Sequence, residues 1–472
     1  MQILTSKNLK LPLIKVILSL MKTIDKVHEI ANAVHHAGGR ALMVGGCVRD
    51  HLLGETIKDY DLEIYGLSAA QLLAALEPVC ETDAVGMSFG VLKVKHFDID
   101  LALPRRENKT GKGHRGFIVD VDPAMDFSTA AARRDFTINA IMRDIITGEI
   151  IDPHNGQKDL QNRILRHVSP AFSEDPLRVL RGMQFISRFD LVPDPQTTEL
   201  CSTLSQNELP PERIATEWEK LLLKGTHIVK ALNFLRAVNW VRYYPALQNL
   251  INCPQNPFWH PEGDVWNHTL LVTEAAAKMR KNSADDLIFM LAALCHDFGK
   301  PCCTVIQNDG KITSAGHDTA TADAEKFITS IWLRRDLPER VIPLISRHMH
   351  PWQLVENGSS DKAFRKLALH VKRLDILADL AEADVRGIIM RDDERCSRLA
   401  KIDIFRKRCQ ALAIADSVPA PLILGRHLIE RGMTPGAAFK PMLDRCFEAQ
   451  LAGEFTTLSE ALEYLDNVLC GK

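Results

Sequence analysis

The sequence lacks the patterns that mark several large classes of protein. No CxxC spacing occurs among its 11 cysteines, which are dispersed and odd in number, so neither a zinc ribbon nor a disulfide framework is indicated. Scattered reduced thiols of this kind are typical of a cytoplasmic protein. No apolar run is long enough to cross a membrane, because the best candidate, residues 11–21, is too short and contains Lys15. We therefore expect no membrane partner.

An excess of charge of one sign is also missing. The 58 Lys and Arg residues nearly balance the 60 Asp and Glu residues, for a formal net charge of −2. A chain that binds nucleic acid is usually basic overall, so this balance argues at first against such a partner. Hydrophobic residues make up 46% and charged residues 25% of the 472 residues, which are the proportions of a globular protein with two to four domains.

Periodicity changes near residue 163, and this change predicts the fold class. Before that point, short alternating segments such as 91–95 and 97–101 are typical of strands and are interleaved with helical patterns. Beyond it, strands are expected to stop and helical spacing dominates. We predict an α+β head, built as a mixed sheet with helices, followed by an all-α neck and body and a further all-α domain.

These patterns also predict domain boundaries. Residues 1–20 carry little functional weight, because Met21 opens a plausible chain of its own and no small-residue cleavage site follows the apolar stretch. The expected parts are an N-terminal extension at 1–23, a head at 24–163, a neck and body at 164–250, a further helical domain at 251–400 and a helical tail at 401–472.

Acidic residues near the start of the head have the spacing of a metal site. Asp59 and Asp61 stand two residues apart at the beginning of a predicted strand, so both carboxylates project from one face. Asp100, on a neighbouring predicted strand, is a third candidate. Gly45-Gly46 lies between a strand and a helix, where backbone N–H groups can approach phosphate oxygens, and Arg49 follows to grip a triphosphate. Three carboxylates that hold two Mg²⁺ ions suit nucleotidyl transfer.

Four ordered motifs resemble those of class II tRNA nucleotidyltransferases and bacterial poly(A) polymerases. They are Val44–Asp50 with Lys58–Asp61, then Arg133–Ala140, Asp152–Leu160 and Ser173–Arg181. The resemblance implies a head that binds Mg²⁺, CTP and ATP and a helical body that holds the 3′ end of a tRNA. It also implies that Arg134 and Arg181 face phosphate or ribose. Asp135 and Asn139 are expected to hold sugar hydroxyls or the geometry of their own motif.

Asp175 and Arg178 form the pair that we expect to select the base. Their spacing of three residues on a predicted helix places the two side chains side by side. Cytosine and adenine each offer an amino donor next to a ring-nitrogen acceptor, which suits a carboxylate beside a guanidinium. Guanine and uracil offer a carbonyl at that place and would leave buried charges unpaired. The alternative is an intrahelical salt bridge, worth about 0.3–0.5 kcal/mol.

The motifs leave open which polymer the head makes. Residues 106–132 are polar and rich in charge, with Arg106, Lys109, Lys112 and Arg115. They resemble the flexible loop that full CCA-adding members need for the change from C to A, which favours complete CCA addition. Poly(A) polymerase and partial CC- or A-adding activity remain the alternatives, and a solvated loop with no mechanistic role is the plain interpretation of the segment.

A second set of candidate ligands lies in the helical part of the chain. Adjacent His296 and Asp297 follow an apolar helical pattern, although neither side chain is readily buried without a partner. With His268 and Asp384 they resemble the metal ligands of the HD phosphohydrolase superfamily, which assigns an HD domain to residues 251–400. Imidazole and carboxylate ligands suit Mn²⁺, Ni²⁺, Fe²⁺ or Zn²⁺. The resemblance implies phosphatase and 2′,3′-cyclic phosphodiesterase activity.

Further contacts to this site are expected from His317 and His348. Two alternatives belong to other classes of function: an HD-type nucleotide phosphohydrolase with a non-catalytic head, and an RNA-binding scaffold. The sequence leaves open whether the protein is a monomer or a homodimer. The net charge of −2 is then an average over acidic metal sites and basic segments such as 105–115 and 163–181. The overall charge balance therefore no longer excludes an RNA partner.

Overall fold

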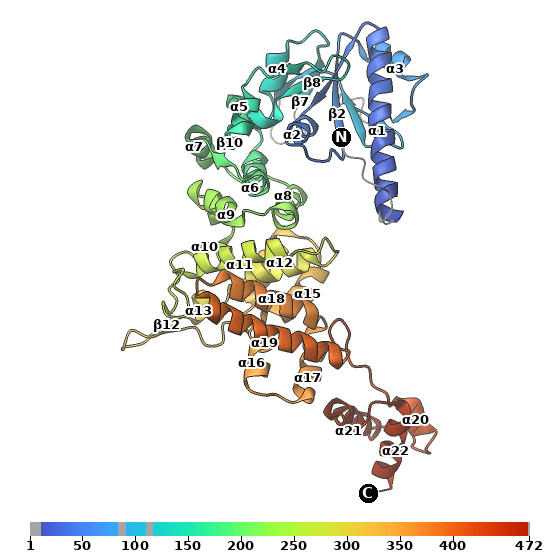
Figure 1. Ribbon diagram of the computed structural model, residues 1–472, viewed down its shortest axis with the longest axis vertical. Coiled ribbons are helices and arrows are strands. Elements are labelled where there is room, and N and C mark those ends of the chain that lie inside the picture. The colour runs from blue at the N-terminus through green and yellow to red at the C-terminus, as the bar shows by residue number, and fades with distance from the viewer. Residues whose placement is uncertain (1–10, 84–90, 110–116, 471–472) are drawn as a thin grey trace. The chain divides into compact units, whose positions relative to one another are not determined.

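The computed structural model describes residues 11–83, 91–109 and 117–470, and it divides into two compact units, Met1–Leu209 and Pro210–Lys472 (Figure 1). Each unit is described by itself below. No helix in the described ranges is both long and apolar enough to cross a membrane. The finer division into five parts, and the cytoplasmic location, stay predictions.

The predicted mixed sheet of the head is confirmed in the first unit. Seven strands lie in the order β3-β4-β5-β2-β1-β8-β9, and all neighbours are antiparallel except β2 and β5. The strands are β1 (Arg40–Val44), β2 (Tyr60–Tyr65), β3 (Thr82–Asp83), β4 (Val91–Val94), β5 (Ile99–Ala102), β8 (Met142–Asp144) and β9 (Ile150–Ile151).

Both faces of this sheet are covered, because its central strands are apolar on both sides. In β1, Ala41 and Met43 belong to one hydrophobic cluster, and Leu42 and Val44 belong to another. Helices α1 (Leu11–His36) and α3 (Ala69–Leu76) supply the first cluster, and α4 (Phe127–Ala132) supplies part of the second. Ser68 caps α3, with its hydroxyl accepting from the backbone N–H of Gln71.

The register of β2 and β5 brings the head carboxylates together. Asp61 pairs directly with Asp100 across the parallel ladder, and Asp59 immediately precedes β2. The other helices of the first unit come between these strands or after them in the chain. They are α2 (Gly46–Leu52), η2 (Thr137–Asn139), α5 (Gly156–Gln161), η3 (Pro170–Glu174), α6 (Leu177–Phe189) and α7 (Pro195–Thr203).

Three small ladders correct the sequence-based expectations. The predicted loop at 106–132 contains paired strands β6 (Arg105–Lys109) and β7 (Phe117–Val121), although Lys112 and Arg115 lie outside the described residues. Strands also continue beyond residue 163, as β10 (Ile164–Leu165) with β11 (Val192–Pro193) and β12 (Val305–Ile306) with β13 (Ile312–Thr313). Two-residue strands escape detection because an alternating pattern needs about four residues to appear.

The second unit is helical, as predicted, apart from the short hairpin β12–β13. Its described helices up to the tail are α8 (Pro211–Lys224), α9 (Ile228–Ala237), η4 (Trp240–Tyr243), α10 (Pro245–Gln248), α11 (Val265–Met279), α12 (Asp286–Cys295), α13 (Lys300–Cys303), α14 (Ala322–Ile331), α15 (Asp336–Ile345), α16 (His350–Glu356), α17 (Asp361–Val371), α18 (Leu374–Gly387) and α19 (Asp392–Ala411).

The centre of this unit is α12, all of whose residues are buried. A helix that is apolar all round is stable only in an interior, so α12 delivers the residues that follow it into the core. Helix α18 packs closely against α11. A Cβ atom added at Gly387 would lie 2.4 Å from the Val272 side chain, which is too close for any residue other than glycine. Only glycine permits this close crossing, which brings residues of α11 and α18 together.

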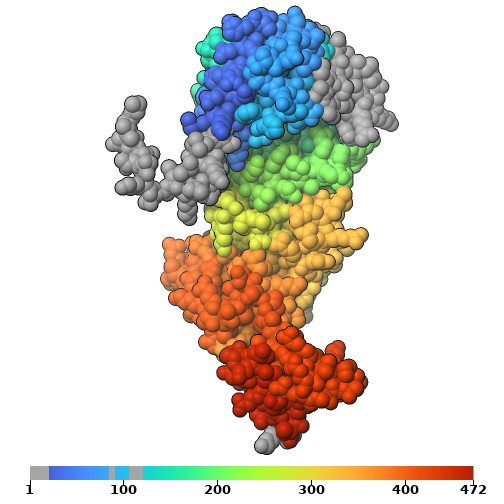
Figure 2. Space-filling view, turned by 90° about the vertical axis from the view of Figure 1, so that its right-hand side faces the viewer, coloured from blue at the N-terminus to red at the C-terminus, as the bar shows by residue number. Residues whose placement is uncertain are grey.

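The tail forms a hydrophobic cluster of its own. Helices α20 (Gly425–Ile429), α21 (Phe439–Ala452) and α22 (Leu458–Leu469) share buried residues that include Leu428, Cys446 and Leu465. Figure 2 draws these helices in the darkest red, packed against one another.

Candidate active sites

The head carboxylates gather at the end of β2. Asp59 and Asp61 are exposed, and the Asp100 side chain is 42% exposed and lies 3.6 Å from the Lys93 ammonium. The pKa of Asp61 is raised because its carboxylate has lost part of its contact with solvent and because the charges of Asp59 and Asp100 lie nearby. The charge of Arg134 opposes this rise. Three carboxylates that stand this close together offer the oxygen ligands that hard divalent cations prefer.

Gly45 and Arg134 lie directly against this cluster. Gly45 has a φ of 75°, and a Cβ there would come within 3.0 Å of Arg134 Nη1 and 3.8 Å of Asp61 Oδ2. Glycine is therefore required both by the backbone conformation and by the space. Gly46 follows as the first residue of α2. Arg134 Nε is buried and has no hydrogen-bond partner among the described residues, so it is suited to a ligand that carries acceptor oxygens.

Glu63, which the sequence analysis did not single out, holds the arginines of this site. Its side chain is 1% exposed, and it accepts hydrogen bonds from Arg133 and from the Tyr65 hydroxyl, the latter at 2.9 Å. Arg134 Nη2 lies 3.8 Å from the same carboxylate. The period of two along β2 was the available signal, because Glu63 continues the series begun by Asp59 and Asp61.

A buried polar network joins the remaining residues predicted for the head. Arg49 is buried, and its guanidinium donates to Asn139 Oδ1 at 2.6 Å and to Asp50. Asn139 donates to Asp135 at 2.9 Å, and Asp135 accepts from Arg181 at 2.8 Å. Burial alone would raise the pKa of Asp135, but the Arg181 charge and the hydrogen bonds lower it below its ordinary value.

In this network Arg49 is directed at Asn139 and Asp50, so its expected grip on a triphosphate stays a prediction. The network connects α2, η2 and α6, the elements that carry three of the four head motifs. Within their motif, Asp135 and Asn139 are bonded to each other, and their expected contacts with sugar hydroxyls stay a prediction. Arg181 is partly exposed, with a side chain at 32% of full accessibility.

The expected base-selecting pair does not share a helix. Helix α6 begins at Leu177, and Asp175 lies ahead of it in an extended conformation, with Oδ1 accepting from the Leu177 N–H at 3.2 Å. The reason is Pro176, because a residue that precedes proline is excluded from the helical region. Arg178 donates to the carbonyl oxygens of Ala171 at 2.9 Å and Arg133 at 2.6 Å. Its guanidinium is therefore anchored by backbone.

In the second unit, the structure brings together all four predicted HD ligands. His268 lies on α11, His296 and Asp297 follow α12, and Asp384 lies on α18. His268 Nε2 is 3.3 Å from His296 Nε2, 3.5 Å from Asp297 Oδ2 and 3.1 Å from Asp384 Oδ1. Ligand atoms around a tetrahedral ion with bonds of about 2.0–2.1 Å lie about 3.3 Å apart.

The donor set fits a divalent transition metal. The side chains of His268, His296 and Asp297 are each 1% exposed. Asp297 forms an ion pair with Lys300 at 2.7 Å, but neither of its buried oxygens has a partner in hydrogen-bond geometry among the described residues. Burial would raise the pKa of Asp297, yet its interactions with the neighbouring His296 and Lys300 side chains hold it well below its ordinary value. An ionised Asp297 is a suitable candidate ligand.

His317 and His348 lie at the other side of Asp297. His317 Nε2 is 3.4 Å from Asp297 Oδ1, and ligand atoms of Asp297, His317 and His348 all lie within 4.8 Å of one another. Burial is the main reason that the pKa of His348 falls to about 4, so its imidazole is neutral near pH 7. His348 can therefore contribute a neutral donor, and His317 lies close enough to belong to the same group of candidate ligands.

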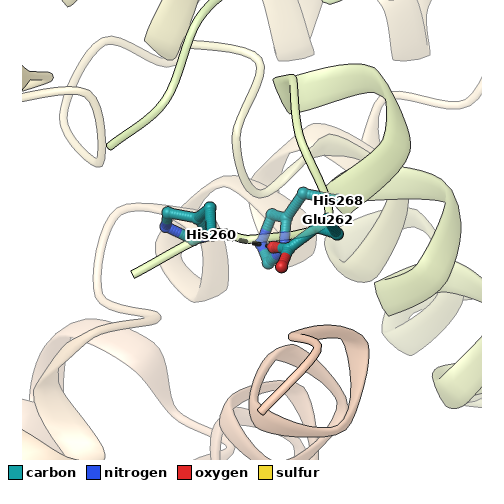
Figure 3. Close-up of side chains that lie close together, drawn as sticks. All are labelled: His260, Glu262 and His268. Carbon is teal, nitrogen blue, oxygen red and sulfur yellow. Dashed lines mark hydrogen bonds and ion pairs between the residues drawn. The ribbon is translucent and has the colours of Figure 1, made fainter. Parts of the chain in front are cut away.

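Two residues around His268 were missed by the sequence analysis. The Glu262 carboxylate lies 2.8 Å from His268 Nδ1 and 2.9 Å from His260 Nδ1 (Figure 3). Burial lowers the pKa of His268, but hydrogen bonds with Asp384 and Glu262 raise it to about 9. In the sequence, Glu262 stands two residues after His260 and six residues before His268. Such a spacing is too common to indicate a site by itself.

A cavity of about 930 Å³ opens onto the HD ligands. Its walls include Trp259 and Trp352 and the basic residues Arg398 and Lys401. Trp259 is 52% exposed, and the Arg398 guanidinium lies 5.6 Å from its ring centre. A pocket with metal ligands at its base and aromatic and cationic side chains on its walls can accommodate an anionic, ring-containing ligand.

Two family models match the chain in the places where these sites lie. The poly A polymerase head domain matches residues 41–166, and the HD domain matches residues 265–384. Domains of both kinds are metal-dependent, and the structure holds candidate metal-binding groups in the second. Each match contains the carboxylates or histidines of one site.

Curated relatives match across both units. The multifunctional CCA protein of Xanthomonas campestris pv. campestris (strain B100) is 32% identical over 403 residues, which cover 81% of this chain and 94% of that protein. The one from Actinobacillus pleuropneumoniae serotype 5b (strain L20) is 35% identical, with 73% and 85% covered. The match to the multifunctional CCA protein of Xylella fastidiosa (strain M23), at 40% identity, covers 55% of this chain and 62% of the relative's length.

Solved structures share the fold. The Bacillus stearothermophilus CCA-adding enzyme in complex with CTP has a TM-score of 0.59 at 21% identity, over 95% of this chain and 98% of that one. The Thermotoga maritima CCA-adding enzyme complexed with tRNA has a TM-score of 0.58 at 16% identity, over 93% and 94%. Taken with the extent of the curated matches, the head and HD architecture shows that the chain belongs to the family of multifunctional CCA proteins.

Proposed function

We propose that this chain adds CCA to the 3′ end of tRNA from CTP and ATP, and that its second unit hydrolyses phosphoesters at a transition-metal site. The observation that carries the proposal is that one chain, aligned with 94% of a multifunctional CCA protein, keeps both a three-carboxylate cluster in the head and a complete HD ligand set. A head-only polymerase would need no second ligand set, and an isolated phosphohydrolase would need no head cluster.

In the head, Asp59, Asp61 and Asp100 are the residues that would hold Mg²⁺, which when bound would activate the attacking hydroxyl and stabilise the leaving pyrophosphate. Gly45, Gly46 and Arg134 would bind the triphosphate. The 3′ hydroxyl of the tRNA attacks the α-phosphorus of the incoming nucleotide, and the bond from that phosphorus to the bridging oxygen breaks. The buried, unpartnered Nε of Arg134 beside Asp61 supports this assignment.

Selection of C and A is assigned to Asp175 and Arg178. The two backbone carbonyls that hold Arg178 fix its guanidinium in place, so its remaining N–H groups can donate to the acceptor nitrogen of a base. The Asp175 carboxylate would accept from the exocyclic amino group. Because the Arg178 side chain is anchored before a nucleotide binds, a base without the matching pattern leaves charged groups unpaired and is rejected.

In the second unit, His268, His296, Asp297 and Asp384 would hold Mn²⁺, Ni²⁺, Fe²⁺ or Zn²⁺, which when bound would supply Lewis-acid activation for hydrolysis of a phosphoester. His317 and His348 would add contacts through Asp297. The size of the cavity, with Trp259 and Trp352 on its walls, supports an RNA end with a 2′,3′-cyclic or terminal phosphate as substrate. The basic side chains of Arg398 and Lys401 would offset the charge of its phosphate groups.

A tRNA extension assay tests the first part of the proposal. Purified chain is incubated with tRNA that ends before CCA and with each nucleoside triphosphate alone and in pairs, and the products are sized and sequenced. We expect three added residues, CCA, with CTP and ATP together, and no added G or U. A long A tract would indicate a poly(A) polymerase, and addition of CC or A alone would indicate a partial enzyme.

The variant Asp59→Ala tests the mechanism in the same assay. It is expected to lose extension while the second unit still hydrolyses a cyclic phosphodiester, which shows that the variant is folded. Normal nucleotide incorporation by Asp59→Ala would contradict the head as the catalytic site. If the wild-type chain hydrolyses the cyclic phosphodiester but adds no nucleotide to tRNA, the result would favour the alternative of an HD-type phosphohydrolase with a non-catalytic head.

A further inference from the structure

The histidines of the HD site share one orientation, but one of them has a different partner. In each case Nδ1 faces an oxygen that can only accept, so Nδ1 carries a proton and Nε2 is the nitrogen that faces the site. Backbone carbonyl oxygens at 2.7–2.9 Å serve this purpose for His296, His317 and His348. His268 differs, because its Nδ1 faces a side-chain carboxylate, that of Glu262.

The Glu262 side chain is built into this position. It is 1% exposed, and its Oε1 accepts from Nδ1 of both His268 and His260 (Figure 3). Its Oε2 accepts from the backbone N–H of Ile389 at 3.3 Å, two residues beyond the end of α18. Both oxygens of this carboxylate are thus used, and every one of its partners is a donor.

We propose that Glu262 is a positioning residue that presets His268 as a metal ligand and ties it to Asp384. This inference rests on the proposed metal site of the second unit. When an ion binds at Nε2, the carboxylate keeps the remaining ring proton on Nδ1, and its anionic charge strengthens Nε2 as a donor to the ion. Its bond to Ile389 holds the chain that follows α18, so the two ligands stay 3.1 Å apart.

An amide cannot replace this carboxylate, because Glu262 faces donors on both sides. In Glu262→Gln, one orientation of the amide points its NH₂ group at the Ile389 N–H. The other orientation points the NH₂ group at His268 Nδ1, which then must give up its proton to Nε2 and lose the lone pair directed at the ion. Either orientation disturbs the ligand set while leaving the size of the side chain unchanged.

The test measures metal affinity rather than turnover. Full-length chain carrying Asp61→Ala, so that the head cluster is impaired, is freed of metal and titrated with Mn²⁺, and free Mn²⁺ is measured by electron paramagnetic resonance. Glu262→Gln is expected to weaken binding at the HD site about 10–100-fold. Glu274→Gln is the matched control, because Glu274 lies on the same helix as His268 and accepts from the Val229 N–H at 3.1 Å. Its affinity is expected to stay within about twofold of the parent.

A double-mutant cycle separates positioning from general destabilisation. If Glu262 acts through His268, then Glu262→Gln adds no further loss of Mn²⁺ affinity to a chain that carries His268→Ala. An equal loss in both backgrounds would overturn the proposal, and so would an affinity unchanged by Glu262→Gln alone. If Glu262→Gln fails to fold, Glu262→Asp keeps the charge but withdraws it from His268, and the same loss of affinity and the same cycle are expected.

Failure of the proposed function gives a different result. If the parent chain binds no Mn²⁺ that is lost on Asp297→Ala, the second unit has no such metal site, and both the proposed hydrolysis and this inference fall. If the parent chain binds Mn²⁺ at this site but Glu262→Gln leaves the affinity unchanged, only the inference about Glu262 is contradicted.

Discussion

Asp59 and Asp61 in the head are exposed, whereas His268, His296 and Asp297 in the second unit are each 1% exposed. In the head, neighbouring carboxylates and loss of solvent raise the pKa of Asp61. In the HD site, positive partners outweigh burial and hold the pKa of Asp297 well below its ordinary value. The head carboxylates stand at the surface with Lys93 and Arg134 as their positive neighbours, whereas Asp297 is enclosed, with Lys300 beside it.

This difference indicates how each site is completed. The pairing of β2 with β5 places the head carboxylates, and we expect cations and a nucleotide to complete that site. In the second unit, carbonyl oxygens and Glu262 already orient the candidate ligands, so we expect that site to need only an ion and a substrate. The arrangement of the head site is therefore expected to depend mainly on its bound substrates. The arrangement of the HD site is expected to depend mainly on the side chains around it.

The largest expected effect comes from removing one ligand in each site. Asp61→Ala is expected to reduce CCA addition more than about 100-fold, because removal of a metal ligand costs more than removal of a residue that only orients a ligand. Hydrolysis of a 2′,3′-cyclic phosphate by the same variant is expected to stay within about twofold of the wild-type rate. Asp297→Ala is expected to give the reverse pattern. Steady-state rates of both reactions on the same preparations check this pair. Loss of both activities in either variant would contradict the separation of the two sites.

A smaller effect is expected at the base-selecting pair. Arg178→Ala removes the guanidinium anchored by Ala171 and Arg133, so discrimination between ATP and GTP should fall about 10–100-fold, the loss of about 1–3 kcal/mol from one bidentate contact. The ratio of kcat/KM for single-nucleotide addition measures it. If the ratio is unchanged while the overall rate falls, then Arg178 has only a structural role.

A third prediction concerns Glu63, which holds Arg133 and Arg134. Glu63→Gln keeps the shape of the side chain but loses its charge, which is worth about 1.5–3 kcal/mol in hydrogen bonds to charged groups. We expect KM for CTP and ATP to rise about tenfold, with kcat changed less, in the extension assay. Glu149→Gln is the control, since Glu149 pairs with Arg40 on the same sheet outside the carboxylate cluster. Similar behaviour of the two variants would argue against this role for Glu63.

The smallest effect on activity is expected from Asp135→Asn, which acts on stability. The pKa of Asp135 is lowered in the folded chain, so its stabilisation is present above its ordinary pKa of about 3.8 and is lost as the pH falls below that value. Loss of one charged hydrogen-bond partner, about 2 kcal/mol, should lower the Tm of the first unit by about 4–8 °C at pH 6. Calorimetry at lower pH should show the difference between wild type and variant shrinking. A difference that grows would contradict the lowered pKa.

Much of both sites follows from local sequence patterns. The spacing of two between Asp59 and Asp61 on a strand, and the apolar helix that precedes His296 and Asp297, each determine where side chains point. The pairing of Asp61 with Asp100 follows once β2 and β5 are neighbours, which agrees with the expectation that Asp100 lies on a neighbouring strand. Periodicity and motif order were sufficient for these residues because strand and helix geometry is regular.

The rest depends on tertiary contacts that no local pattern contains. Asp175 leaves the expected helix because of the adjacent Pro176, a local rule that the motif spacing obscured. Glu63 and Glu262 matter through arginine and histidine partners that are distant in the chain or in a turn, so their type alone carried no signal. Arg49 has the composition of a phosphate-binding residue, yet its guanidinium is held by Asn139, 90 residues away.

One substrate tests the central claim that two independent sites serve one RNA end. A tRNA that ends before CCA in a 2′,3′-cyclic phosphate can accept a nucleotide only after water has opened the ring to a phosphomonoester and, where the phosphate stays on the 3′ oxygen, a second hydrolysis has released it. With CTP and ATP, the wild-type chain is expected to extend it by CCA, and Asp61→Ala and Asp297→Ala are each expected to fail alone and to succeed when mixed. Extension of the blocked tRNA by Asp297→Ala alone, at the wild-type rate, would contradict the account.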